Sequence, residues 1–142
     1  MPSFTSQISN LRITGPVVEI GIAVAAGIER ALRAQGQPVP PPIRALALVD
    51  TGASATVVQL GMAAQLGLHP VGVTLINTPS STRVRCYEYR VQLLIGTDVV
   101  VETKAIEAPL EGQNIRCLIG RDVLAHGVLV YIGYSNLFSL SF

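Results

Sequence analysis

The chain has 142 residues, enough for one domain, residues 1–142, with its own hydrophobic core. Hydrophobic residues make up 49% of it and charged residues only 13%, so little polar material is left for the surface. We therefore expect part of an apolar surface to be covered by a second copy of the chain. The net charge of +1, without a run of basic residues, argues against nucleic-acid binding.

The two ends of the sequence were considered as a signal peptide and as a membrane span. The first ten residues lack the basic start and apolar run of a signal peptide, so we expect a cytoplasmic location. Residues 123–142 contain no Asp, Glu, Lys or Arg and are long enough to span a bilayer. Glycine, serine and asparagine interrupt them, however, which predicts two short strands joined by a turn at 133–136 and no membrane span.

The first half of the chain alternates between apolar runs and breaks. Several predicted elements follow from this pattern: strands at 5–13 and 17–24, a short helix at 25–35, an exposed proline-rich loop at 36–42, and a buried strand at 44–49. Asp50 comes directly after the last of these strands.

The second half consists mostly of short apolar runs separated by turn residues. It predicts a strand or short helix within 57–68, a hairpin of strands 71–77 and 83–95, a strand at 99–106, a strand at 115–119, a short helix starting within 120–124, and strands at 128–132 and 137–142. Many short strands with little helix indicate an all-β fold, either a barrel or a sandwich.

Asp50, Thr51 and Gly52 have the properties that a catalytic loop needs. A buried strand holds the carboxylate rigidly, the Thr51 hydroxyl can anchor the turn, and Gly52 lets another backbone approach closely. One carboxylate alone catalyses peptide hydrolysis poorly, because activation of water needs a base and an acid together. Two carboxylates that share one proton supply both. This motif occurs only once in the chain.

Three segments give the sequence a resemblance to the retropepsin-like aspartic proteases, which include retroviral proteases and bacterial relatives. The run Leu46-Ala47-Leu48-Val49-Asp50-Thr51-Gly52-Ala53-Ser54 is similar to the active-site strand and loop of the family. The run Leu118-Ile119-Gly120-Arg121-Asp122-Val123-Leu124 is similar to its hydrophobic-hydrophobic-Gly-Arg segment and the short helix after it. Between them, the predicted hairpin lies where the family has its flap. The resemblance covers residues 17–142, with an insertion at about 25–42.

The resemblance implies the fold of one acid-protease lobe, which is a small closed barrel of short antiparallel strands. It also implies an aspartic endopeptidase that is active as a homodimer, without a cofactor or metal. Asp50 from each subunit would hold a water and act as general base and general acid on an extended peptide substrate. The sites that it implies are the active-site loop of Thr51, Gly52, Ala53 and Ser54, the flap at about 73–90 with its tip of Thr78, Pro79, Ser80, Ser81 and Thr82, and the supporting residues Ile119, Gly120, Arg121 and Asp122.

Individual roles follow from the same resemblance. Thr51 would bond to the active-site loop of the other subunit, and the carbonyl of Gly52 would bind the substrate backbone. Gly120 would pack beneath the loop, and Arg121 would brace the dimer contact. Retroviral members commonly carry an acidic residue where this chain has Ser54, which cannot form an ion pair with Arg121. The resemblance therefore implies a dimer that is held differently or is weaker.

Other interpretations remain open at this point. The chain could be a retropepsin-like module that binds an extended peptide without cutting it, and Asp50 could be a turn residue that caps its own backbone. Cys86 and Cys117 are too few for a disulfide framework and are expected to be buried, inert thiols. His69 and His126 have no metal-ligand spacing with cysteine or acidic residues, so no zinc site is predicted.

Overall fold

The computed structural model describes residues 2–77, 81–110 and 114–142. Ten strands are present in these ranges: β1 (Ser3–Gln7), β2 (Val17–Val24), β3 (Ile43–Val49), β4 (Val57–Gln59), β5 (Gly72–Ile76), β6 (Val84–Ile95), β7 (Val99–Ala108), β8 (Ile115–Ile119), β9 (Val128–Ile132) and β10 (Leu137–Ser141). The helices are short: α1 (Leu11–Thr14), α2 (Ala26–Ala34), α3 (Met62–Gln65), α4 (Arg121–Leu124) and the 3-10 turn η1 (Gly133–Ser135).

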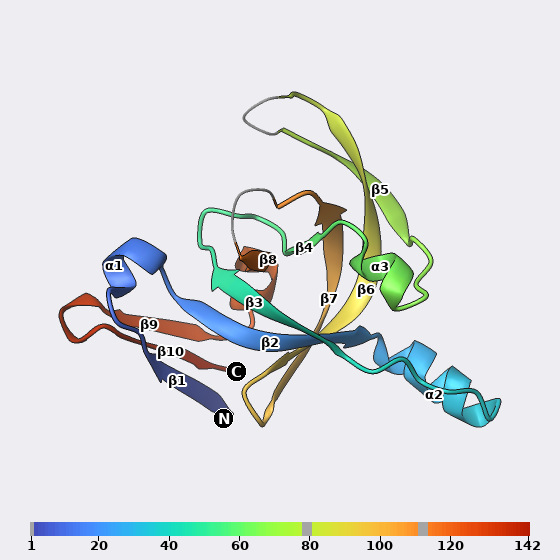
Figure 1. Cartoon of the computed structure of the whole chain (residues 1–142), viewed down its shortest axis with the longest axis horizontal. Helices are drawn as coiled ribbons and strands as arrows, with labels where there is room; N and C mark the ends of the chain where they lie inside the picture. Colours follow the sequence, from blue (N-terminus) through green and yellow to red (C-terminus); the bar gives the residue numbers. More distant parts are fainter. Residues whose placement is uncertain (1, 78–80, 111–113) are drawn as a thin grey trace.

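Six strands close a barrel. Their order is β2-β3-β8-β4-β7-β6, and β6 pairs back onto β2 to complete the ring. The seventh strand, β5, pairs with β6 and extends the sheet beyond the ring, so β5 and β6 form a hairpin that projects from the barrel (Figure 1). Alternating side chains of β6 and β2 fill the barrel, because successive residues of a strand point to opposite faces.

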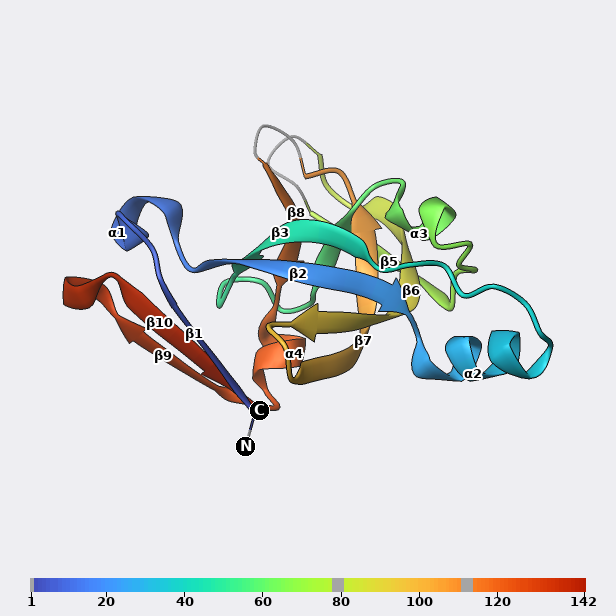
Figure 2. The same cartoon turned by 60° about the horizontal axis from the view of Figure 1, so that its bottom comes forward.

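The two ends of the chain form a second sheet of order β1-β10-β9, separate from the barrel (Figure 2). Phe138 and Leu140 of β10 are fully buried and belong to the barrel core, so one face of this terminal sheet packs on the barrel. The opposite face carries Val128 and Val130, which are 51% and 44% exposed. The terminal sheet therefore has one apolar face inside the core and a partly apolar face outside it.

Two expectations from the sequence need correction. The strand expected at 5–13 stops at Gln7, and residues 11–14 form α1 instead. Asn10 takes a left-handed backbone conformation (φ 66°), and the Leu11 N–H donates to Oδ1 of Asn136, which ends the strand. The barrel is also not wholly antiparallel, because β3 pairs with β8 and β4 pairs with β7 in parallel.

Most other predicted elements are confirmed within a few residues. Residues 57–68 contain both of the alternatives, because β4 is followed by α3. Residues 123–142, which were weighed as a membrane span, include strands β9 and β10 around the η1 turn. Within the described ranges, no helix is long and apolar enough to cross a bilayer.

Candidate active site

The loop after β3 places Asp50 at the point where a buried strand leaves the barrel. Val49 is buried, Asp50 is half-buried, and Thr51 and Gly52 are exposed. The Asp50 N–H donates to the carbonyl of Ile119 at 2.9 Å, so the parallel pairing of β3 with β8 continues up to the carboxylate residue. The position of Asp50 is thus set by two neighbouring strands rather than by the loop alone.

The Asp50 carboxylate has one bonded and one open oxygen. Oδ1 accepts the Gly52 N–H at 2.9 Å, and the carbonyl of Asp50 accepts the Ala53 N–H at 3.2 Å. These bonds form the tight turn that a capping aspartate makes. Within the ranges that the structure describes, no donor bonds Oδ2. The turn therefore fixes the orientation of the carboxylate and leaves one oxygen available for a bond from outside the chain.

The segment after β8 braces this loop from below. The Arg121 N–H donates to the carbonyl of Ala53 at 2.9 Å, and its guanidinium donates to the carbonyl of Thr51 at 2.6 Å. Arg121 is exposed and makes no ion pair among the described residues. In one chain, then, Arg121 holds its own active-site loop through two backbone carbonyls, a role that does not require an acidic residue at Ser54.

Gly120 allows the two segments to approach closely. A Cβ at this position would lie 2.5 Å from the carbonyl carbon of Ala55 and 2.9 Å from the nitrogen of Thr56. Its φ of −88° suits any residue, so the need for glycine is one of space. This contact brings the segment after β8 against the end of the loop that carries Asp50.

A buried side-chain network connects the two segments, and the sequence did not reveal it. Thr56 is fully buried; its hydroxyl accepts the Gly120 N–H at 3.1 Å and donates to Oδ1 of Asp122 at 2.8 Å. The other carboxylate oxygen of Asp122 accepts the Thr103 hydroxyl at 2.9 Å. A threonine beside the apolar Val57 was a weak signal for this role of Thr56, and Thr103 on β7 gave no signal.

Side chains of the hairpin and of the active-site loop pack against one small apolar cluster. Cys86, Ile106 and Ala108 form the centre of this cluster, which is separate from the barrel core. Side chains from the loop and β4 (Ala55, Val57) and from the hairpin (Ile76, Val84) pack against it. The part of the hairpin next to its turn thus shares an apolar cluster with residues that directly follow Asp50. Of the predicted flap tip, Ser81 and Thr82 are exposed, whereas Thr78, Pro79 and Ser80 lie outside the described residues.

Both cysteines are free and buried, as expected. Burial raises the pKa of Cys117 to about 12, with a further contribution from the charge of Asp122. Burial also raises the pKa of Cys86. A thiol with a raised pKa stays protonated at neutral pH and is a poor nucleophile, so neither cysteine is a candidate nucleophile.

Comparison with known proteins agrees with this geometry. The sequence matches the family model described as gag-polyprotein putative aspartyl protease over residues 42–126, more than half of the chain. The structure is similar to that of a retropepsin-like aspartic protease from Rickettsia conorii, with a TM-score of 0.51 and 15% identity over 99% of this chain and 94% of that chain. At this identity the likeness concerns the fold alone. A comparison with curated proteins found no match. The chain belongs to the gag-polyprotein aspartyl protease family and has a retropepsin-like fold.

Proposed function

We propose that the chain is one subunit of an aspartic endopeptidase that is active as a homodimer. The observation that carries this proposal is the fixed, half-buried Asp50 carboxylate with one oxygen held by Gly52 and the other open. A single carboxylate lacks the acid that the reaction needs, and the family motif occurs once in the chain. The second carboxylate is the partner's Asp50.

The proposed reaction uses the two carboxylates with one shared proton. The ionised Asp50 takes a proton from a water while the water oxygen attacks the peptide carbonyl carbon, and the protonated partner gives its proton to the carbonyl oxygen. In the second step the first Asp50 returns its proton to the peptide nitrogen. The partner carboxylate takes a proton from one hydroxyl of the tetrahedral intermediate, and the C–N bond breaks. The products are a carboxylic acid and an amine, and the pair regains one proton.

The terminal sheet is the surface on which we place the dimer contact. Val128 and Val130, on the outer face of β9, are 51% and 44% exposed, and Tyr134 of η1 is 94% exposed. In both views the C-terminal end of β3 points to the side of the molecule where this sheet lies (Figures 1 and 2). A second copy that covers the sheet would bring its own Asp50 towards the first. Burial of these apolar side chains would supply the driving force.

The substrate in this proposal is an extended peptide held between the active-site loop and the hairpin. The part of the hairpin next to its turn and the active-site loop share the apolar cluster around Cys86. In Figure 1 β5 and the first part of β6 curve upward from the barrel, towards the side on which the loop after β3 lies. The apolar neighbours of this cluster, Ala55, Val57, Ile76 and Val84, are only partly buried, which supports a preference for apolar side chains next to the cleaved bond. Closure of the hairpin would exclude bulk water from the reacting atoms.

Cleavage of an unfolded protein across mildly acidic pH tests the catalytic proposal. Asp50→Asn keeps the shape of the side chain and its bond from Gly52 but removes the titratable carboxylate, so we expect discrete fragments by mass spectrometry from wild type and none from the variant. Asp98→Asn, at an exposed turn, is the matched control and should cleave like wild type. Fragments from Asp50→Asn would contradict the proposal. Peptide binding by both proteins without cleavage would favour the binding-module interpretation instead.

The dimer requires a separate measurement. Val130→Asp puts a charge on the exposed face of the terminal sheet, and Val130 faces away from the barrel core, so the fold should survive. We expect sedimentation velocity to show a shift from dimer to monomer and cleavage to fall with it. A monomeric wild type that cleaves would refute the need for a second Asp50. A dimer that is unchanged by Val130→Asp would place the contact elsewhere.

A further inference from the structure

Strand β5 has a free edge outside the barrel. It lies at the end of the seven-stranded sheet and, in the part of the chain that the structure describes, pairs with β6 alone. Residues 71–76 contain no charged residue and no proline, which are the usual features that prevent an exposed edge from pairing with another strand. The backbone N–H and C=O groups on the outer side of β5 are thus placed to receive one more strand.

The side chains on one face of this hairpin are apolar and exposed. Val71, Val73 and Leu75 alternate along the strand and are 55%, 50% and 50% exposed, and Tyr87, which pairs with Val73, is 48% exposed. We call these four residues the β5 stripe. Four adjacent large apolar side chains with about half of their surface in water indicate a surface that binds a partner.

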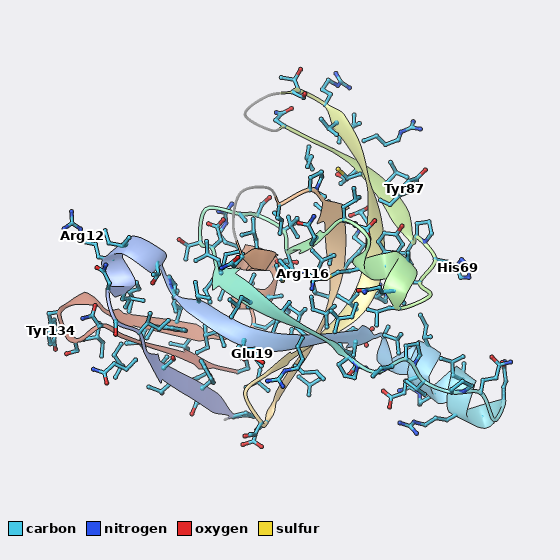
Figure 3. The ribbon with its side chains drawn as sticks, viewed as in Figure 1. Arg12, Glu19, His69, Tyr87, Arg116 and Tyr134 are labelled. Atoms are coloured by element: carbon cyan, nitrogen blue, oxygen red, sulfur yellow. The ribbon has the colours of Figure 1, made fainter. Side chains whose placement is uncertain are left out.

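The β5 stripe faces away from the proposed substrate cleft. Ile76 and Val84 pair with each other and pack on the cluster next to the active-site loop, whereas Leu75 and Arg85 lie one residue away and therefore point to the opposite face. A partner on the stripe would leave the cleft free. Figure 3 shows Tyr87 on the outer side of the hairpin, on the same side of the molecule as His69.

An apolar groove continues the stripe beyond the start of β5. It has a volume of about 530 Å³ and lies between α2 and the segment that follows α3. Apolar side chains line it: Ile28, Leu32, Pro38, Pro40, Leu66 and Val71. Val71 belongs to both the stripe and the groove, so the two form one surface. A concave apolar groove at the end of a strand edge fits a bulky apolar side chain that anchors a peptide.

Two exposed arginines lie at the other end of the β5 stripe. Arg85 pairs with Leu75 on the same face, and Arg83 lies two residues before it; both are exposed. Among the described residues neither guanidinium makes an ion pair, whereas Arg90 and Lys104 pair with Glu102 and Glu88. Charge complementarity therefore favours a partner with an acidic group at this end of the surface.

We propose that the β5 edge docks an extended segment of another protein as an additional strand. Its alternate apolar side chains cover Val73 and Leu75, a bulky apolar residue fills the groove, and an acidic residue meets Arg85. The preferred direction is antiparallel to β5, which places the acidic residue towards the N-terminal end of the segment. A lipid surface would contact the stripe and the arginines but would use neither the strand edge nor the groove, so the surface fits a polypeptide better. The proposal does not depend on catalysis at Asp50.

A designed peptide tests the docking surface directly. The probe is a fluorescein-labelled octapeptide of alternating valine and threonine, with two glutamates at its N-terminus and a phenylalanine near its C-terminus. Fluorescence anisotropy with the Asp50→Asn chain should show saturable binding without cleavage. Arg85→Glu and Leu75→Thr should each weaken it by about tenfold, because they remove the charge partner and the apolar contact. Arg12→Glu, at the opposite end of the molecule in Figure 3, should leave it unchanged.

The same experiment distinguishes the other occupants. Replacing the two glutamates of the probe with lysines should reduce binding to Arg85, and equal binding of both probes would overturn the charge argument. Binding that neither Arg85→Glu nor Leu75→Thr weakens would place the peptide in the cleft and overturn the proposal. Absence of peptide binding would also overturn it, whether the chain then sediments with phosphatidylserine vesicles, which would assign the surface to lipid, or self-associates through Leu75, which would assign it to a second copy. Far-UV circular dichroism checks that each variant is folded.

Discussion

The hydroxyl of Thr56 makes two hydrogen bonds in the network beneath the active-site loop, and its contribution to stability can be measured. Thr56→Val keeps the side-chain shape but leaves the Gly120 N–H without its acceptor at 3.1 Å and Asp122 without its donor at 2.8 Å. A buried N–H without a partner costs about 1–3 kcal/mol, and a hydrogen bond to a charged group contributes about 1.5–3 kcal/mol. The extra methyl group of valine offsets part of the loss. We expect the free energy of unfolding to fall by roughly 3 kcal/mol.

Thr103→Val is the matched control for this substitution. Its hydroxyl makes one bond to Asp122, at 2.9 Å, and the side chain is half-buried, so water can replace the lost donor. We expect a loss of about 1 kcal/mol. Urea unfolding followed by far-UV circular dichroism measures both variants, at one protein concentration because dimer formation contributes to apparent stability. The slope of the unfolding free energy against urea should be the same for all three proteins.

The difference between the two threonines decides whether the network works as described. Equal losses for Thr56→Val and Thr103→Val, or a loss below about 1 kcal/mol for Thr56→Val, would refute the assignment of two bonds to the buried hydroxyl. A double-mutant cycle with Asp122→Ala gives a second check. If Thr56 acts through Asp122, the two substitutions should be non-additive by more than about 0.5 kcal/mol.

Three further predictions concern the residues around this network. Gly120→Ala would force its Cβ against the backbone of Ala55, so we expect a stability loss of roughly 1–3 kcal/mol and weaker cleavage; an unchanged melting temperature would contradict this close approach. Arg121→Ala removes the donor to Thr51. Because the guanidinium is exposed, we expect the free energy of unfolding to change by less than about 1 kcal/mol, but the cleavage rate to fall on the order of tenfold and to recover partly in Arg121→Lys. A cleavage rate equal to that of wild type would show that Arg121 does not brace the loop. The pKa of Cys117 rises on folding from 9.0 to about 12, so the unfolded chain loses this proton first, and stability that is intact below pH 9 should fall by about 1.4 kcal/mol by pH 10. Urea unfolding at several pH values should show that Cys117→Ala lacks this fall in unfolding free energy. If the unfolding free energy changes with pH in the same way in wild type and variant, the thiol is not shielded from water.

Local patterns in the sequence were enough to predict most of the strands and the site loop. Alternation of apolar residues marked β2, β8 and β9 at the bounds that the structure has, because each strand has one face in the core. The apolar run that ends at Asp50, followed by small residues, predicted the turn that the Gly52 N–H closes. The resemblance added the contact between this loop and Gly120, 70 residues downstream, which no local pattern contains.

These local patterns do not predict which distant strands pair with each other. An apolar strand looks the same whether its neighbour runs parallel or antiparallel, so the parallel pairing of β3 with β8 was not predicted. The strand expected to reach residue 13 stops early because Asn136, from the other end of the chain, binds the backbone at Leu11. Such contacts depend on which segments the fold brings together.

By itself, then, the sequence determined most of the strands and placed Asp50 at the end of a buried strand. Those features depend on residue type and on periods of two along the chain, which are local. The barrel and the aspartic protease family were implied by the resemblance of three segments. Only the tertiary structure decided that Thr56 and Thr103 share the carboxylate of Asp122, and that β5 lies at the end of the seven-stranded sheet beside an apolar groove. Both arise where β4, β5 and β7 meet segments far away in the chain, and their hydrogen bonds and exposed edge exist only after the barrel has closed.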